Sequence, residues 1–200
     1  MKLYFAPRTR ATRARWLLEE LEVPYELELV KLDVSKQETT TPAHLALHPL
    51  GEVPVLVDGA TVLFESLAIC LHLADRFPEK QLAPPLGSAE RGPYLQWIVF
   101  AEVTLEPLVL EHYRNAQLPE ERKANLAPQQ ARLGEVLKAI EARVEGREFI
   151  AGDSFTAADL VMASILHLAH TLKLLDGSPK LFEYVLRHAK RPAARRAVSG

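Results

Sequence analysis

VPVLVDGATVLFESLAIC, residues 53–70, is the stretch that decides the fold of the first part of the chain. Two apolar runs, 53–57 and 60–64, flank an Asp-Gly pair at Asp58-Gly59, a pattern that predicts a β-hairpin with its turn at that pair. The apolar spacing after the second run then changes from two to about 3.6 residues. We therefore expect a helix that starts at Ser66 and ends near Phe77.

Upstream of the hairpin, the sequence predicts two strands separated by a helix. KLYF at 2–5 is short, apolar and aromatic, whereas apolar residues recur at helical spacing over 9–21. PYELELVKL at 24–32 alternates apolar with charged residues, as a half-buried strand does. TTTPAHLALH at 39–48 predicts a short, irregular helix. The order β-α-β-α-β-β-α predicts an α/β domain over 1–77 that begins with a βαβ unit.

The second part of the chain is expected to be all-helical. Residues 78–92 hold three prolines and two glycines, which indicates a linker over 78–88. A helical domain over 89–200 is expected to follow, with helical patterns in 93–113, 124–146, 156–172 and 179–198. Thr156 and Asp159 have the spacing of a capping box at the start of the third of these helices.

Composition excludes several classes of function. A formal net charge of −2 argues against a nucleic-acid partner. No run of the sequence approaches the roughly 18 unbroken apolar residues of a membrane helix, so no membrane partner is expected. One cysteine, Cys70, precludes an internal disulfide and a cysteine-rich metal site. We expect a cytoplasmic protein without a metal cofactor.

Two short motifs in the first domain are suited to a peptide ligand. Proline cannot donate to a β-ladder, so Val53-Pro54 at a strand start predicts a cis bond that turns the Val53 backbone toward open space. An extended peptide could pair with that backbone as a strand. Ser66 at a helix N-terminus can hold a carboxylate, and Glu65 can accept from an ammonium group.

In their order and spacing along nearly the whole chain, the motifs HPLGEVPVL, ESLAI and FTAADL resemble those of the cytosolic glutathione transferases. The resemblance implies a thioredoxin-like N-terminal domain, a helical C-terminal domain and a homodimer. It also implies that Val53 and Pro54 contact the cysteinyl part of glutathione. Glu65 and Ser66 would hold the γ-glutamyl end, and the helical domain would bind the second substrate, with Phe100 and Tyr113 as candidate wall residues.

The stretch FAPRTRATRARW, residues 5–16, is where this resemblance places thiol activation. The serine of theta- and delta-like classes falls on Thr9, and the cysteine of the beta class falls on Arg10. Thr9 is expected to donate to the glutathione thiolate, with Arg10 as an alternative or additional activator. Thr9 as a simple helix cap is the structural alternative.

The chain departs from the family pattern in two places beside the expected glutathione site. Glu52 stands where the family commonly has Lys or Gln, which helps to hold the glycyl carboxylate, and His48 replaces a common Asn. Gln37, Lys36 or His48 are the candidates to compensate for Glu52.

Three functions remain open from the sequence. The first is a glutathione transferase that acts on an electrophilic small molecule, and the second is a glutathione-dependent disulfide or peroxide reductase. The third is a non-catalytic transferase-like binding protein, which the negative charge of Glu52 favours.

Overall fold

The computed structural model of the chain describes residues 1–33, 39 and 41–199, and these divide into two compact units. The first unit is Met1–Ala83 together with Lys190–Gly200, and the second is Pro84–Ala189. The expected ranges 1–77, 78–88 and 89–200 differ from these units most at the C-terminus. The reason is that the last helix packs on the first helix of the chain, which belongs to the first unit.

The first unit contains a four-stranded sheet with the order β2-β1-β3-β4. Strand β2 is parallel to β1, and β3 is antiparallel to both β1 and β4. Its elements are β1 (Lys2–Phe5), α1 (Ala11–Leu21), β2 (Glu26–Leu29), α2 (Pro42–Leu45), β3 (Val55–Asp58), β4 (Thr61–Phe64), α3 (Ser66–Arg76), a 3-10 turn (Pro78–Lys80) and α9 (Pro192–Val198). This order confirms the βαβαββα pattern expected of a thioredoxin-like domain.

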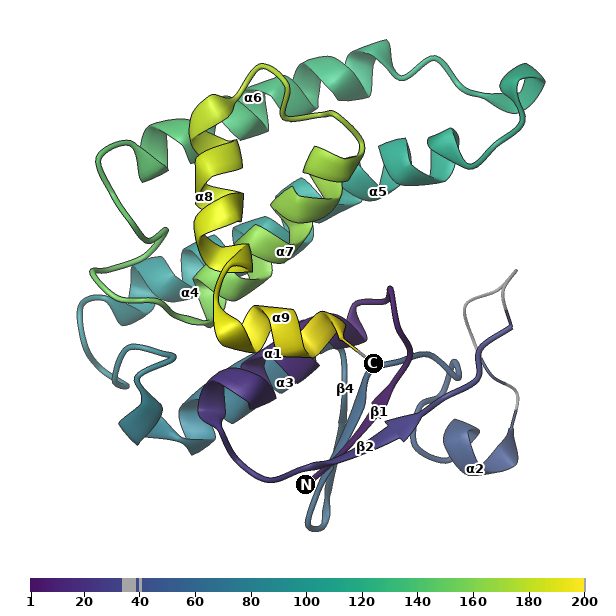
Figure 1. Cartoon of the computed structure of the whole chain (residues 1–200), viewed down its shortest axis with the longest axis vertical. Coiled ribbons are helices and arrows are strands. Elements are labelled where there is room, and N and C mark those ends of the chain that lie inside the picture. The colour runs from purple at the N-terminus through teal and green to yellow at the C-terminus, as the bar shows by residue number, and fades with distance from the viewer. Residues whose placement is uncertain (34–38, 40, 200) are drawn as a thin grey trace. The chain divides into compact units, whose positions relative to one another are not determined.

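Alternation along β1 assigns the two faces of the sheet. Leu3 and Phe5 are buried on the face that α1 covers, and α1 in turn packs against α3 and α9 (Figure 1). Tyr4 points to the opposite face, where its ring lies 5.6 Å from that of His44 on α2. The sheet therefore has its apolar core on one side and the short helix α2 on the other.

The hairpin is confirmed, but its turn lies one residue later than expected. Asp58 pairs with Thr61, so the two central residues are Gly59 and Ala60 rather than Asp58 and Gly59. Gly59 has a φ of 60°, the positive value that a II′ turn requires at its first central residue. Asp58 is thereby left in the strand, buried, where its carboxylate accepts from His72 and Arg76 of α3.

The C-terminal helix α9 is fixed to α1 by three charged contacts that sequence spacing did not reveal. Arg191 pairs with Glu20 at 2.6 Å, and Arg196 pairs with Glu19 at 2.6 Å. Arg15 donates to the Ser199 carbonyl at 2.7 Å. The i,i+4 ion pair suggested by the spacing of Arg15 and Glu19 is absent among the described contacts, because Glu19 binds Arg196 and the Tyr25 hydroxyl instead.

The second unit is all-helical. It consists of α4 (Arg91–Phe100), a π-helical segment (Ala101–Leu105), α5 (Glu106–Ala116), a 3-10 turn (Glu120–Arg122), α6 (Ala127–Val144), α7 (Ala157–Thr171) and α8 (Pro179–Ala189). The π-helical segment is explained by Pro107, which has no N–H for the ladder and would clash with the carbonyl four residues earlier in a regular α-helix.

Helix α7 is the centre of this unit, since ten of its residues are buried. The expected capping box is confirmed at its start. Thr156 is the N-cap, and the Asp159 carboxylate accepts from the Thr156 N–H, the Ile150 N–H and the Tyr184 hydroxyl. Burial raises the pKa of Asp159, while these hydrogen bonds oppose that rise.

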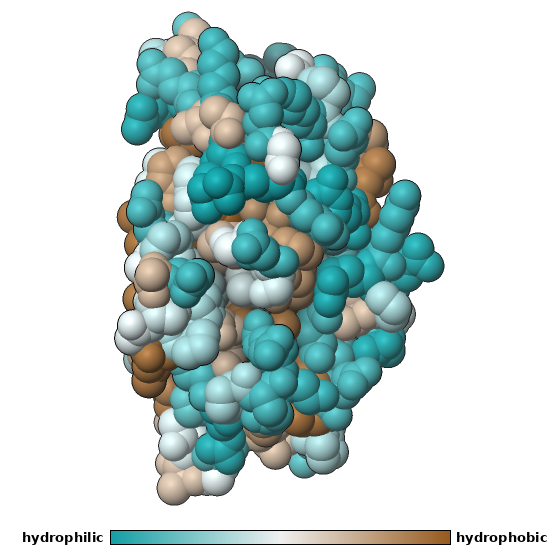
Figure 2. All heavy atoms as spheres, turned by 90° about the vertical axis from the view of Figure 1, so that its left-hand side faces the viewer, coloured by the Kyte–Doolittle hydropathy of each residue, from teal (hydrophilic) through white to brown (hydrophobic). Residues whose placement is uncertain are grey.

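The exterior is mainly polar on the face that Figure 2 shows, where apolar residues form only small, scattered groups. The search for membrane spans covered the described residues, and none of their helices has the length and apolar character needed to cross a bilayer.

Candidate functional site

The first helix turn of α3 carries an unpaired buried hydroxyl. Ser66, the first residue of α3, is only 3% exposed, and its Oγ has no hydrogen-bond partner among the described residues. Buried hydroxyls are normally paired, so each exception calls for an explanation. The hydroxyl adjoins the N–H groups of the first helical turn, which have no intrahelical acceptors. This combination is suited to an anionic group such as a carboxylate.

Glu65 precedes Ser66 in an uncommon backbone conformation. Its φ is 71° and its ψ is 116°, whereas positive φ values are rare for residues other than glycine. Such conformations persist where the surrounding structure imposes them, and they gather at ligand sites. Glu65 is exposed and its carboxylate has no ion-pair partner among the described residues, so it is available to a cation.

The Val53-Pro54 peptide bond is cis, which confirms the expectation from the sequence. Val53 lies before β3, and within the described part of the chain its backbone makes no hydrogen bond. Pro54 is buried and Val53 is half-buried. An unpaired N–H and C=O next to a strand are what a bound peptide backbone requires.

The segment before Val53 is held by two buried histidines and one glycine. His44 Nε2 lies 2.8 Å from the Glu52 carbonyl oxygen, and His48 Nδ1 accepts from the Leu50 N–H at 3.1 Å. Gly51 has a φ of 68°, and a Cβ at this position would lie 2.0 Å from the Thr39 carbonyl oxygen, so only glycine fits.

Burial lowers the pKa of His48, while the carboxylates of Glu52 and Glu65 act in the opposite direction. His48 is therefore close to two of the predicted site residues. Glu52 is half-buried. Gln37 and Lys36, the other candidates near the glycyl end, lie outside the described residues.

Thr9 uses its hydroxyl within its own turn. Its Oγ1 donates to the Ala6 carbonyl at 2.7 Å and accepts from the Ala11 N–H at 3.2 Å. A hydroxyl has one hydrogen, so in this geometry the donor expected to face a thiolate is engaged by the protein. Arg10 is the N-cap residue of α1 and is exposed.

Strand register brings these three stretches together. Tyr4 pairs with Val55 in an antiparallel ladder, so the chain that leaves β1 toward Thr9 and the chain that enters β3 from Val53 lie at the same end of the sheet. Val55 also pairs with Phe64, which places the start of α3 at that end. The first unit thus gathers the thiol, backbone and carboxylate candidates along one edge.

The two candidate wall residues for a second substrate lie in the helical unit. Phe100 ends α4 and packs against Trp97 with ring centroids 5.3 Å apart, whereas Tyr113 is 41% exposed on α5. Thirteen residues of continuous helix separate them, a rise of roughly 20 Å. They are therefore too far apart along the helix to form one compact wall.

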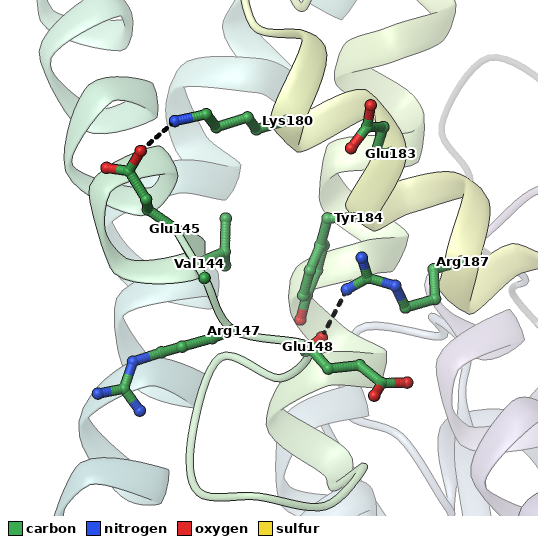
Figure 3. A pocket seen from close by; sticks show the side chains of 9 residues that line it. Val144, Glu145, Arg147, Glu148, Lys180, Glu183, Tyr184 and Arg187 are labelled. Atoms are coloured by element: carbon green, nitrogen blue, oxygen red, sulfur yellow. Dashed lines mark hydrogen bonds and ion pairs between the residues drawn. The ribbon is translucent and has the colours of Figure 1, made fainter.

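A hollow of about 590 Å³ lies between α8 and the C-terminal end of α6, and none of the predicted site residues lines it. Figure 3 shows the Lys180–Glu145 ion pair on one side and the Arg187 bond to the Glu148 carbonyl on the other. The hollow is open, and cationic and anionic side chains are present in it in equal number, which is typical of a solvated surface.

Sequence reasoning identified Val53, Glu65 and Ser66 but missed the contact of His44 with the Glu52 carbonyl. A signal was available, since a histidine on a short helix nine residues before Val53 is within reach of that loop. Sequence alone does not show which backbone group a buried imidazole contacts.

Comparison with known proteins agrees with this arrangement. Residues 1–75 match the family model of the glutathione S-transferase N-terminal domain, and residues 115–187 match the C-terminal domain. A probable glutathione S-transferase GSTF2 from Oryza sativa subsp. japonica is 31% identical over 100% of this chain and 96% of its own length. Glutathione S-transferase GstA from Escherichia coli O157:H7 is 29% identical over 100% and 98%.

Solved structures give the same result. A sphingomonad glutathione S-transferase in complex with glutathione superimposes with a TM-score of 0.83 at 27% identity, over 99% of this chain and 97% of that one. Fold, site geometry and relatives agree, and this chain belongs to the glutathione S-transferase family.

Proposed function

We propose that this chain is a glutathione transferase of the serine/threonine type, similar to the theta and delta classes, which activates the glutathione thiol for attack on an electrophilic small molecule. The observation that carries the proposal is the unpaired, buried hydroxyl of Ser66 beside Glu65. Its place at the same end of the sheet as Val53 and Thr9 fits a ligand with a carboxylate, a peptide backbone and a thiol in that order.

The γ-glutamyl end of glutathione carries an α-carboxylate and an ammonium group. In the proposal, the Ser66 hydroxyl and the first N–H groups of α3 donate to the carboxylate, and the Glu65 carboxylate accepts from the ammonium group. The cysteinyl N–H and C=O pair with the Val53 backbone next to Pro54. Glu52 and Gln37 complete the site near the glycyl end.

The cysteinyl sulfur then lies toward the start of α1, next to Thr9 and Arg10. A free cysteine thiol has a pKa of about 8.5, and lowering it by two units requires about 2.7 kcal/mol of differential stabilisation. The helix N-terminus and the Arg10 guanidinium favour the thiolate. The Thr9 hydroxyl adds a donor when its C–O bond rotates from the Ala6 carbonyl to the sulfur.

The reaction needs no nucleophile from the protein. The thiol proton passes to solvent, and the thiolate electron pair forms a carbon–sulfur bond with the electrophile. Where the electrophile carries a leaving group, that group departs with the pair of the broken bond. This explains why the stretch at 8–15 holds four arginines and no cysteine.

We also propose a cytoplasmic homodimer. Leu95, Val99 and Val103 lie about one turn apart on α4 and the π-helical segment, with exposed fractions of 37%, 44% and 65%. The opposite face of these turns is buried within the helical unit. An apolar stripe of this kind fits a second copy of the chain. Val103→Glu should convert the dimer to a monomer by light scattering at micromolar concentration, and a parent protein of monomeric mass would contradict this.

Retention on immobilised glutathione, followed by thermal unfolding with free glutathione, tests the proposed function. At about 100 times its dissociation constant, glutathione should raise the free energy of unfolding by about 2.7 kcal/mol. Turnover with an aryl halide supports the transferase reaction, and turnover of a glutathionyl disulfide alone would favour a reductase. A parent protein that neither binds nor reacts with glutathione would refute the proposal.

A further inference from the structure

His44 is buried on the face of the sheet opposite the main core. It lies on α2, is 5% exposed, and its ring meets that of Tyr4 edge-on. Its Nε2 lies 2.8 Å from the Glu52 carbonyl oxygen. Since a carbonyl oxygen only accepts, this distance assigns a hydrogen to Nε2, and His44 is the donor.

This hydrogen bond acts on the peptide group that contains the Val53 N–H. The atoms from the Glu52 Cα to the Val53 Cα lie in one plane, because a peptide bond has partial double-bond character. In a trans peptide the N–H points away from the C=O, and the only cis bond found in the described residues is the next one, Val53-Pro54. Holding the Glu52 oxygen therefore sets the direction of the Val53 N–H.

The other contacts of this loop hold residues that precede Glu52. The Leu50 N–H donates to His48 Nδ1, and the Gly51 N–H donates to the His48 carbonyl at 3.0 Å. The Gly51 carbonyl accepts from the Thr39 N–H at 2.8 Å. Within the described residues, the side chain that reaches the Glu52-Val53 peptide itself is that of His44.

We infer that His44 is a positioning residue for glutathione, which fixes the Val53 N–H in the orientation that the cysteinyl backbone requires. The inference rests on the proposed function, because it takes glutathione to be the peptide that pairs with Val53. His44 touches no ligand and acts through the plane of one peptide group. Its loss should weaken glutathione binding and leave thiol activation at the start of α1 unchanged.

Two substitutions separate positioning from packing. His44→Phe keeps a ring against Tyr4 but removes the donor, and His44→Gln restores an N–H at a similar reach. The matched control is His72→Phe, which removes the Asp58 contact of a histidine in the same unit, away from Glu52. For each variant we would measure the amide shift of Val53 by NMR without ligand, the KM for glutathione, kcat, and the pKa of the bound thiol.

His44→Phe should move the Val53 amide signal and raise the KM for glutathione by about 3- to 10-fold, the equivalent of one neutral hydrogen bond. kcat and the bound-thiol pKa should stay at the parent values. His44→Gln should recover most of the loss, and His72→Phe should leave the KM unchanged.

The inference is wrong if His44→Phe leaves both the Val53 signal and the KM at parent values, or if His44→Gln is as impaired as His44→Phe. A parent protein without glutathione affinity is a different result, which refutes the proposed function. In that case the NMR arm still decides whether His44 orients the Val53 amide.

Discussion

Helices α1 and α3 both begin just beyond a strand of the same sheet, at the same end, and each has a hydroxyl at its start. The Thr9 hydroxyl before α1 donates to Ala6 and accepts from Ala11, so its turn is complete without a ligand. The Ser66 hydroxyl at α3 is buried and has no partner among the described residues.

This difference indicates which part of the site is formed in advance. A buried, unpaired hydroxyl beside a residue with a φ of 71° costs stability, and a ligand carboxylate would recover that cost. The start of α1, by contrast, has to give up an internal hydrogen bond before Thr9 can serve a thiolate. We therefore expect the γ-glutamyl end to provide affinity and the thiol end to respond to binding.

Ser66→Ala is the sharpest test of the α3 side and should have the largest effect. Loss of a hydrogen bond to a charged group should weaken glutathione affinity about 10- to 100-fold in calorimetric titrations. The ligand-free protein should be as stable as the parent or more so, since a buried group without a partner is removed. Ser164→Ala, which removes a hydroxyl paired with the Val161 carbonyl, is the control. A ligand-free Ser66→Ala protein that is clearly destabilised would show that Ser66 is paired inside the protein.

Thr9→Val should give the opposite pattern. It removes two local hydrogen bonds, so the free energy of unfolding should fall by about 1 kcal/mol without ligand. The pKa of bound glutathione should rise by about one unit in a thiolate absorbance titration, the equivalent of about 1.4 kcal/mol. Thr9→Ser should retain both properties. A bound-thiol pKa that is unchanged in Thr9→Val would make Thr9 a cap only.

Arg10→Ala should have a smaller effect than Thr9→Val. Its guanidinium is exposed, so solvent and salt screen its action on the thiolate. We expect an upward shift of about half a unit in the bound-thiol pKa at low salt, and a smaller one at high salt. If Arg10→Ala shifts that pKa more than Thr9→Val does, Arg10 is the main activator and the roles of the two residues are reversed.

The smallest expected effect is a pH dependence at the loop between the two helices. Burial lowers the pKa of His48 below its ordinary value of about 6.5. As the pH falls below that value, the unfolded chain takes up the proton first, so the stability present above about pH 6.5 is lost toward the lower folded pKa. His48→Asn keeps an acceptor for the Leu50 N–H and should flatten this loss between pH 7 and 5. Equal slopes for parent and variant would contradict this.

Local patterns were sufficient for much of the fold and for half of the site. The apolar periodicity of 53–70 gave the hairpin and α3, and a proline at a strand start gave the cis bond at Val53-Pro54. The hairpin turn was misplaced by one residue because the Asp-Gly pair is also compatible with Asp58 as the last strand residue, where it binds α3.

What the sequence could not give depends on contacts between distant residues or on one bond rotation. Arg191 and Arg196 bind α1 from about 170 residues away, so the place of α9 in the first unit was not predictable from spacing. The partner of the Thr9 hydroxyl depends on how the Ala6 carbonyl is turned. The role of His44 depends on which carbonyl lies above α2.

The central claim is that the start of α3 binds the γ-glutamyl end of glutathione, and a pair of ligands tests it most directly. Calorimetric titration would compare glutathione with its glutaryl analogue, which lacks only the γ-glutamyl amino group, on the parent and on Glu65→Gln. The account predicts that the parent binds glutathione about 10-fold or more tightly than the analogue, and that this preference largely disappears in Glu65→Gln. A parent that binds both ligands equally well, or a preference that survives in Glu65→Gln, would contradict it.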